Sequence, residues 1–392
     1  MVSGGDWPQI LGPHRNGLAA DDESLADSWG RDGPTELWKI EVGDGLAGPA
    51  VMDGTVYVFH RQGNSEILQA LALSTGSIRW EYDQPTTYRS SYTSDSGPRC
   101  VPVVHEDHVY VFGAGGQLSC VARGTGEEIW SRNVWADFQP PEGYFGAGSS
   151  PIVIGDRVVL NVGATKAGIV AFDARTGDTE WQLTDELASY SSPVRVDSGS
   201  DTFVIFITRF NVVVIDPVSG TELSRISFGQ RGPTVNAANP LVFDNRVLVT
   251  ASYGIGARLL SIDSQGQLDE VWSRTDLVSS QYVTPILHDD IVFSMDGRAD
   301  GGATRLVVFE PKTGRELWVR DDYGMASMIH ADDKLLLMKT DGELVLVRAN
   351  RQRYEELARH KIMEGTTRAL AALADGRLLV RNSRQLKCVD LR

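Results

Sequence analysis

The chain has 392 residues, of which 42% are hydrophobic, with a formal net charge of −15 and three cysteines. The negative charge disfavours nucleic acid or an anionic membrane as a partner for the whole surface. No apolar run approaches the roughly 18 residues of a membrane-spanning helix, so we expect no membrane span. Cys100, Cys120 and Cys388 are too scattered for a disulfide framework, and we expect them to be small core residues.

The first 35 residues are rich in turn-forming residues and show no strong hydrophobic period. They include Trp7, which Pro8 and Gln9 follow. Disordered tails seldom contain tryptophan. We therefore expect residues 1–35 to form an extension that packs along the surface of the next domain, with Trp7 as its anchor.

From residue 36 onward one phrase recurs: an apolar stretch, a Thr-Gly pair, and a tryptophan four residues after the glycine. Its clearest copies are 171–181 and 308–318, and weaker copies are 214–224 and 262–272. Glycine supplies the positive φ of a tight turn, so each phrase predicts two strands joined by a turn. Recurrence at this period is the signature of a repeat architecture.

A second hairpin with alternating apolar residues precedes each phrase, as in 49–58, 151–160 and 240–249. Each repeat is therefore predicted to be a four-stranded antiparallel meander, whose strands we name A to D. Such a sheet buries both of its faces when copies stack radially around an axis. The pattern thus predicts an all-β propeller.

The tryptophan position counts the blades, because it recurs at intervals of roughly 40–50 residues. The last repeat ends at 387–392 with a C strand and no D strand after it, and residues 36–40 offer the missing strand. Pairing the two ends removes the free edges of an open array. We predict an eight-bladed propeller over residues 36–392, closed by pairing of its N- and C-terminal strands. The counted positions are Trp38, Trp80, Trp130, Trp181, Ser224, Trp272, Trp318 and Leu357.

The charges divide between the two faces of such a propeller. Acids occupy the A–B turns, where Asp is a favourable turn residue. Arg, Lys, Tyr and Asn gather in the opposite B–C and D–A loops and predict a central funnel for an anionic ligand or a protein partner. The alternative is a set of solvated rim charges paired with Asp95, Asp137 and Glu142. The funnel candidates are Arg61, Tyr92, Arg99, Tyr190, Arg209, Asn236, Tyr282, Arg298, Lys339, Arg368 and Arg381.

Catalytic candidates are few. His60 is the histidine at a funnel position, and Asp296 lies near the funnel arginines, so these two would carry acid–base chemistry if the funnel is an active site. The sequence shows no motif of the serine hydrolases, zinc proteases or phosphate-binding loops. His105 and His108 have metal-pair spacing but no third fixed ligand, so we predict no metal site.

The phrase from Asp173 to Trp181 resembles the repeat of pyrroloquinoline-quinone (PQQ) propellers, and the resemblance covers nearly the whole chain. The segments 7–17, 97–99 and 183–193 are similar to those of a widespread group of uncharacterised bacterial PQQ-like proteins. Two branches share the repeat: the quinoprotein dehydrogenases and the propeller lipoprotein of the outer-membrane barrel assembly machinery. The resemblance implies a periplasmic or otherwise exported protein whose leader is absent from this sequence, and a cytoplasmic location stays open.

The dehydrogenase branch has adjacent cysteines over its cofactor, a calcium site and long insertions between blades. This chain has no adjacent cysteines and short loops, so we predict no cofactor, with PQQ as the alternative that a basic funnel would suit. We expect a monomeric, non-catalytic propeller that binds an anionic small molecule or a protein or peptide partner. The second reading is an enzyme with its active site in the funnel, either a quinone-dependent oxidoreductase or one acting on carbohydrates or acids.

Overall fold

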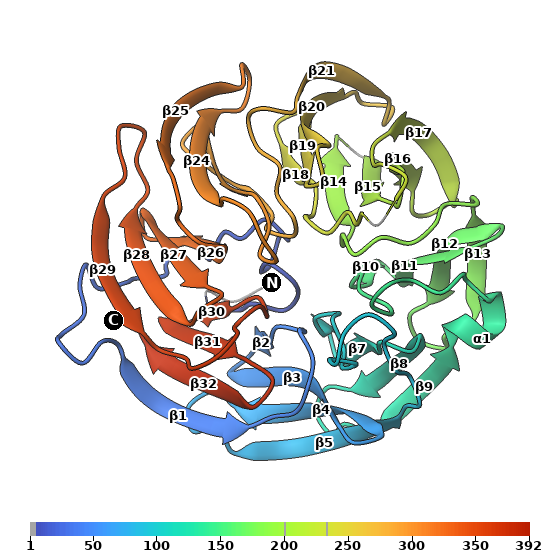
Figure 1. The fold of residues 1–392 in the computed structure, drawn as a ribbon. Coiled ribbons are helices and arrows are strands. Elements are labelled where there is room, and N and C mark those ends of the chain that lie inside the picture. The colour runs from blue at the N-terminus through green and yellow to red at the C-terminus, as the bar shows by residue number, and fades with distance from the viewer. Residues whose placement is uncertain (1–4, 200, 233) are drawn as a thin grey trace.

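The computed structural model describes residues 5–199, 201–232 and 234–392. Across these residues the strands form eight four-stranded antiparallel sheets around a common axis (Figure 1). The prediction of an all-β, eight-bladed propeller is confirmed. None of the helices in this described part is long and apolar enough to cross a bilayer.

Strands A to D of each blade run from the axis to the rim (Figure 1). Blade 1 consists of β2 (Ala50–Met52), β3 (Thr55–Gln62), β4 (Ser65–Ala72) and β5 (Ile78–Pro85), and blade 2 of β6 (Val103–His105), β7 (His108–Phe112), β8 (Gln117–Ala122) and β9 (Glu128–Asn133). Blade 3 consists of β10 (Ile152–Ile154), β11 (Arg157–Ala164), β12 (Ala167–Asp173) and β13 (Thr179–Leu183), and blade 4 of β14 (Val194–Ser198), β15 (Asp201–Ile207), β16 (Asn211–Asp216) and β17 (Thr221–Ser227). Blade 5 consists of β18 (Leu241–Phe243), β19 (Arg246–Ala251), β20 (Gly256–Ile262) and β21 (Leu268–Arg274), and blade 6 of β22 (Ile286–His288), β23 (Ile291–Asp296), β24 (Arg305–Glu310) and β25 (Arg315–Arg320). Blade 7 consists of β26 (Ala326–Ala331), β27 (Lys334–Lys339), β28 (Glu343–Arg348) and β29 (Glu356–Lys361), and blade 8 of β30 (Ala372–Ala374), β31 (Arg377–Arg381), β32 (Gln385–Asp390) and β1 (Thr35–Glu41).

The eighth blade joins the two ends of the chain. Strand β1 pairs antiparallel with β32, so that Trp38 lies opposite Cys388 and Lys39 opposite Lys387. The Lys387 ammonium also lies 2.8 Å from a carboxylate oxygen of Glu36. The predicted closure of the ring is confirmed, and it leaves neither end of the sheet array unpaired.

The Thr-Gly turn and the tryptophan of the repeat form a joint between neighbouring blades. Trp38 Nε1 donates to the carbonyl of Leu73 at 2.8 Å. Gly76 lies against the Trp38 ring with φ of 70°, and a Cβ there would approach the ring to 2.7 Å, so only glycine fits. Where Ser224 replaces the tryptophan, its hydroxyl accepts from Leu268 N instead. The indole bond recurs at 2.9–3.2 Å from Trp80, Trp130, Trp181, Trp272 and Trp318.

The acidic A–B turns are explained by backbone conformation. Asp53, Asp289, Asp332 and Asp375 have φ between 48° and 52°, in the left-handed region that Asp tolerates better than most residues. The A–B and C–D turns share one face, which we call the turn face, and the B–C and D–A loops share the other, which we call the loop face. The negative charge of the turn face therefore follows from turn geometry.

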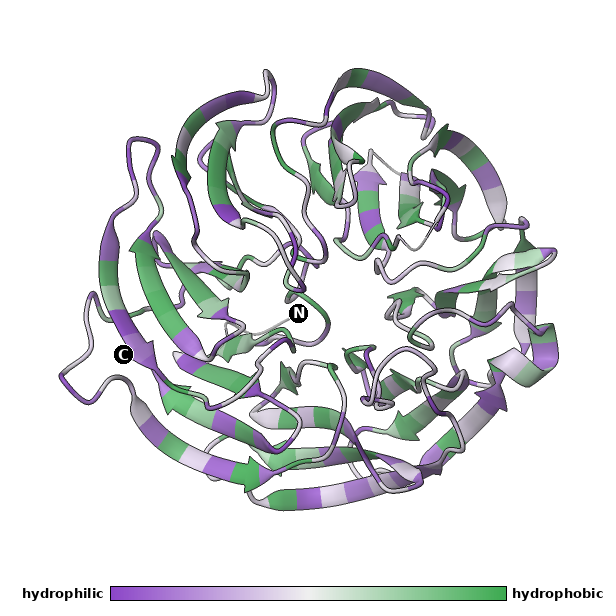
Figure 2. Ribbon diagram, in the orientation of Figure 1, coloured by the Kyte–Doolittle hydropathy of each residue, from purple (hydrophilic) through white to green (hydrophobic). Residues whose placement is uncertain are grey.

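The core lies between the blades and is supplied mainly by strands B and C. Figure 2 shows these strands as largely hydrophobic, whereas the outer D strands alternate. In β3, seven successive residues from Thr55 are buried, whereas β5 is mostly half-buried or exposed. One core cluster spans the closure, joining Val58 of blade 1, Leu346 of blade 7 and Leu379 of blade 8, and it includes Trp7.

The N-terminal extension begins near the axis of the ring and reaches the rim before β1 (Figure 1). Trp7 is 1% exposed, and its backbone exchanges two 2.8 Å hydrogen bonds with Val51 of β2. Pro8 accepts from Val104 of β6, and Leu18 bridges His330 of β26. These contacts give hydrogen-bond partners to backbone groups on the inner strands of blades 1, 2 and 7. Residues 1–4 of the predicted extension lie outside the described residues.

Side chains of the extension complete this contact. Arg15 is fully buried and donates to the carbonyls of Pro151 and, at 2.9 Å, Pro193. Glu23 accepts from the backbone N–H groups of Asp375 and Gly376, both at 2.7 Å, on the turn of blade 8. Residues 5–19 thus occupy the turn-face end of the axis, and the chain then crosses to the rim to become β1.

Candidate functional site

The loop face contains a cavity of about 370 Å³ over blades 2, 3 and 4. The D–A loops that follow blades 1 to 4 surround it, and the ends of the B strands form its floor. Its lining includes the side chains of Tyr92, Trp135, Tyr144, Tyr190, Arg209 and Asn236. The lining comes from blades 2 to 4 and the loops beside them, so the cavity lies to one side of the axis.

The loop after blade 2 builds one wall of the cavity. It begins with α1 (Val134–Phe138), capped by the Asn133 side chain, which accepts from Ala136 N at 2.9 Å. Gln139 adopts a left-handed φ of 52°, and Pro140 and Pro141 stop the helix. The chain then turns back over the cavity, and a rigid proline pair and a short helix hold this wall in place.

A cluster of aromatic rings stands at the rim of the cavity. The Tyr92 and Tyr144 rings meet edge to face with centroids 4.9 Å apart, and Phe145 lies 5.6 Å from Tyr190. The Arg99 guanidinium lies 5.8 Å from the centre of the Phe145 ring. Tyr92 is 63% exposed, an unusual position for a large aromatic side chain. The rim therefore offers apolar surface to solvent.

Three polar side chains line the cavity wall behind this rim. The Tyr190 hydroxyl accepts from Phe145 N at 2.8 Å, and burial raises the pKa of Tyr190 to about 12, so it stays neutral. Asn236 Nδ2 donates to Thr208 O at 2.9 Å. Asn236 Oδ1 and Ser149 Oγ are buried without a hydrogen-bond partner among the described residues. Such orphaned buried atoms are rare and call for an explanation.

Arg209 brings the positive charge of the cavity wall. Its two terminal nitrogens already donate to Thr234 Oγ1 at 2.9 Å and to Gly232 O at 2.7 Å. The guanidinium also lies 4.8 Å from the Phe210 ring centre. The structure thus brings together Tyr92, Tyr190, Arg209 and Asn236 from the predicted funnel set, with Arg99 beside them.

The funnel prediction assigns Arg61 and Arg381 to a ligand, whereas in the structure both guanidiniums bind backbone carbonyls. Arg381 is fully buried and donates to the carbonyls of Gly43 at 2.7 Å and Phe59 at 3.0 Å. Arg61 donates to Tyr88 O at 2.7 Å. The Arg381 guanidinium binds backbone carbonyls where blade 8 meets blade 1, so it holds the closure together. The Arg61 guanidinium binds carbonyls of the loop that follows blade 1. Neither side chain lines the cavity.

The two catalytic candidates are engaged elsewhere. His60 is fully buried, its Nδ1 accepts from Gly43 N at 3.0 Å, and burial lowers the pKa of its imidazole to about 4. Asp296 accepts from Ser279 N at 2.7 Å and from Arg305 Nε at 2.8 Å. Both side chains stabilise loops, and neither lines the cavity.

Three further funnel candidates lie on blades 6 and 8, away from the cavity. The Tyr282 hydroxyl is buried, which raises the pKa of Tyr282 to about 12. Arg298 pairs with Asp300 at 2.6 Å, with its guanidinium 4.5 Å from the Tyr253 ring centre. Arg368 is exposed. The predicted residues therefore do not converge on one central site.

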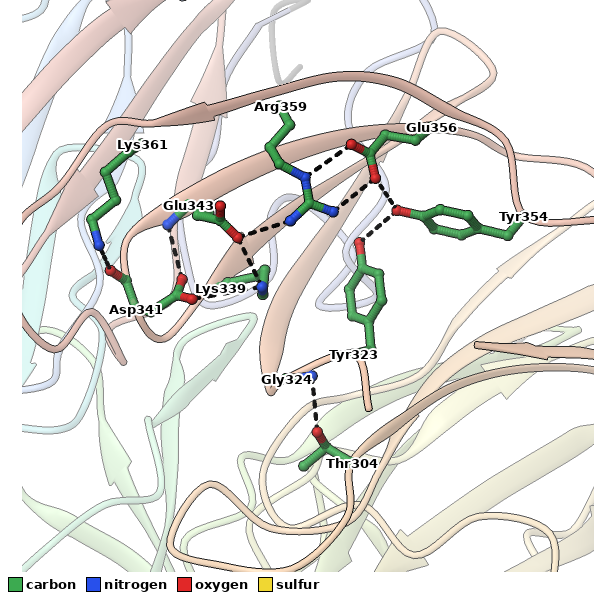
Figure 3. Close-up of polar contacts among 10 residues, drawn as sticks. All are labelled: Thr304, Tyr323, Gly324, Lys339, Asp341, Glu343, Tyr354, Glu356, Arg359 and Lys361. Atoms are coloured by element: carbon green, nitrogen blue, oxygen red, sulfur yellow. Dashed lines mark hydrogen bonds and ion pairs between the residues drawn. The ribbon is translucent and has the colours of Figure 1, made fainter. Parts of the chain in front are cut away.

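Lys339, the candidate of blade 7, belongs to an ion-pair network (Figure 3). Its ammonium lies 2.8 Å from Glu343 Oε2, which also accepts from Arg359 at 2.9 Å. Arg359 continues to Glu356, and Glu356 accepts from the Tyr354 hydroxyl at 2.5 Å. The network joins β27, β28 and β29 of blade 7, so it braces the blade.

A site for PQQ must accommodate three carboxylates. Arg209 is the cation among the described residues that line the cavity, and both of its terminal nitrogens are already bonded. Glu142, also in the lining, adds negative charge. Three carboxylates would therefore face a single guanidinium and the Glu142 carboxylate, and the donor set does not fit this cofactor.

Sequence reasoning missed two groups of residues. Trp135 and the proline pair after it lie between two repeats, where the repeat pattern gives no guidance. His288 and His330 lie near the ends of neighbouring A strands, and the chain gives a signal for them: a histidine at nearly equivalent positions in successive blades. Their contact needs the packing of blade 6 on blade 7.

Comparison with solved structures shows the same fold. The structure of BamB from Moraxella catarrhalis matches with a TM-score of 0.66 at 15% identity, covering 91% of this chain and 98% of that one. Quinohemoprotein alcohol dehydrogenase from Comamonas testosteroni matches with a TM-score of 0.67 at 14% identity, covering 98% of this chain and 80% of that one. At these identities the likeness is one of architecture.

Sequence comparison gives the family. Quinohemoprotein alcohol dehydrogenase from Comamonas testosteroni is 29% identical over 162 residues, which are 39% of this chain and 21% of that protein. 1-Butanol dehydrogenase (cytochrome c) from Thauera butanivorans is 32% identical over 125 residues, 31% of this chain and 17% of that protein. The matches thus span only about a fifth of these curated relatives. A sequence model described as outer membrane protein assembly factor BamB matches residues 64–320, more than half of the chain, and the chain belongs to this family of PQQ-like propellers.

Proposed function

We propose that the protein is a non-catalytic binding propeller that holds a peptide segment of a protein partner in the cavity over blades 2 to 4. The observation that carries this proposal is the exposed aromatic rim, with Tyr92 63% exposed beside Tyr144 and Phe145. Aromatic side chains with a polar tip supply much of the affinity of protein interfaces. Tyr92 is exposed and Tyr144 and Phe145 are half-buried, so this cluster at the cavity suits a partner that covers it.

The polar groups favour a peptide over an anion. An anion offers acceptors, and among the described lining residues the one cationic group, Arg209, lies in the same wall as the Glu142 carboxylate, with two of its five N–H groups already donating. The orphaned atoms of the wall include Asn236 Oδ1, which needs a donor, and Ser149 Oγ, which takes either role. A peptide backbone supplies both N–H and C=O groups, so it complements this wall better.

The family supports the same direction. Its description names an assembly factor of the outer membrane, and the solved relative from Moraxella catarrhalis carries the BamB name. We propose on this basis that the protein acts outside the cytoplasm, as a monomeric scaffold.

The test uses peptides selected from a random library on the purified protein. We expect micromolar peptides whose dissociation constant rises about tenfold or more in the double variant Tyr92→Ala/Tyr144→Ala, since losing about 1.4 kcal/mol of contact has that effect. The matched control is Val218→Ala, because Val218 is also 63% exposed but lies on the turn face. Its affinity should equal that of the wild type.

A second arm titrates citrate and inorganic phosphate into the wild type and into Arg209→Met. Saturable anion binding that disappears in Arg209→Met, without any peptide binding, would replace the peptide proposal by an anion site. Peptides that bind the double variant as tightly as the wild type would place the binding surface elsewhere.

A further inference from the structure

A second cluster of interest lies on the turn face, between blades 6 and 7, far from the cavity. It consists of His288, His330 and Asp333, whose possible ligand atoms all lie within 4.8 Å of one another. His288 ends the inner strand of blade 6, and His330 is the penultimate residue of the inner strand of blade 7. This offset of one residue turns the two imidazoles toward each other, since successive strand residues point to opposite faces.

The candidate ligand atoms are close enough to reach one ion. The two imidazole rings stack with centroids 3.9 Å apart and an angle of 29° between their planes, so one ring rotates when both nitrogen lone pairs point at a shared ion. His288 Nε2 lies 3.5 Å from Asp333 Oδ1, and two atoms bound at about 2.1 Å to one tetrahedral ion are about 3.4 Å apart. His288 Nε2 also lies 3.4 Å from Asp289 Oδ2, which brings a second carboxylate within reach.

An independent observation is the state of His330. This residue is 9% exposed, and its Nε2 atom has no hydrogen-bond partner among the described residues. A buried imidazole nitrogen without a partner carries a desolvation cost that an ion would offset. The strand position of His330 is fixed as well, because its backbone N–H donates to Gly17 O and its carbonyl accepts from Ala19 N, both at 2.9 Å.

We propose that His288, His330 and Asp333 bind one divalent transition-metal ion of the zinc type. Two imidazoles and a carboxylate are the donor set that such ions prefer, whereas calcium and magnesium prefer oxygen ligands alone. The carboxylates of Asp333 and Asp289 are largely exposed, so the ion enters from solvent and keeps water as a further ligand. The bound ion ties blade 6 to blade 7 beside the strand that holds the N-terminal extension.

The experiment is calorimetric titration of Zn²⁺ into metal-free protein, with thermal unfolding measured in parallel. We expect one ion per chain and a rise of the unfolding temperature with zinc. His288→Gln and Asp333→Asn should each weaken binding by about tenfold or more. Asp289→Asn should weaken it less. Asp289 and Asp333 are largely exposed, so the unfolding temperatures of their variants without metal should match the wild type, and that of His288→Gln, at a half-buried position, should lie close to it.

The matched control is the double variant His105→Gln/His108→Gln, which removes the histidine pair on the turn of blade 2. Zinc binding in this variant should equal that of the wild type. Absence of saturable binding with zinc in large excess would overturn the proposal. So would zinc binding that survives both His288→Gln and Asp333→Asn, or that is lost in the control. Equal affinity for Ca²⁺ would also contradict it, because it would indicate carboxylates without imidazoles.

Discussion

Among the described residues, polar side chains are paired at one end of the propeller axis and partly unpaired at the other. At the turn-face end, residues 5–19 fill the axis, and Arg15 is fully buried with its donors on backbone carbonyls. At the loop-face end, a cavity stays open over blades 2 to 4, with an exposed Tyr92 and the unpartnered Asn236 Oδ1. Buried arginines thus mark structure in this fold, and exposed aromatic rings beside orphaned acceptors mark the place where a partner fits.

The largest expected effect tests the closed end. Trp7→Ala removes a 1% exposed indole from the cluster that joins blades 7, 8 and 1, and we expect the free energy of unfolding to fall by about 3–5 kcal/mol. Urea unfolding followed by tryptophan-independent circular dichroism measures it. Val218→Ala should change stability by less than about 0.5 kcal/mol. A loss below about 1 kcal/mol for Trp7→Ala would mean that the extension is dispensable.

The next comparison sets two arginines of the predicted funnel against each other. Arg381→Met leaves the carbonyls of Gly43 and Phe59 without a donor, and we expect a loss of about 2–4 kcal/mol in the free energy of unfolding. Arg209→Met, on a partly exposed loop, should cost less than about 1 kcal/mol. Equal losses in the two variants, measured by the same urea unfolding, would erase the distinction between structural and cavity arginines.

A pH titration sharpens the same distinction at His60. Burial lowers the pKa of His60 from 6.5 to about 4, so the folded state binds fewer protons than the unfolded state between these values. Neutral, buried His60 therefore contributes fully to the free energy of unfolding above pH 6.5. This contribution is lost as the pH falls toward 4, by up to about 3 kcal/mol. His60→Asn should remove this part of the slope of unfolding free energy against pH. An unchanged slope would show that His60 is not the group responsible.

Most of the fold could be predicted from the repeat phrase. Thr-Gly turns and tryptophans recur because each blade needs the same joint, so blade number and closure through β1 could be read from their spacing. The path of the extension could not, since it depends on contacts such as Arg15 to Pro193, which lie 178 residues apart. The same holds for the funnel. Loop position grouped Arg61 and Arg381 with Arg209, and only the structure shows that Arg61 and Arg381 are buried whereas the half-buried Arg209 lines the cavity.

The most direct test of the account is photo-crosslinking from a benzophenone side chain placed at residue 92 or at residue 218 of the protein in living cells. The two positions are equally exposed on opposite faces. The account predicts a discrete protein adduct from position 92 and none from position 218. Adducts from position 218 alone, or the same adducts from both positions, would contradict the assignment of binding to the loop-face cavity.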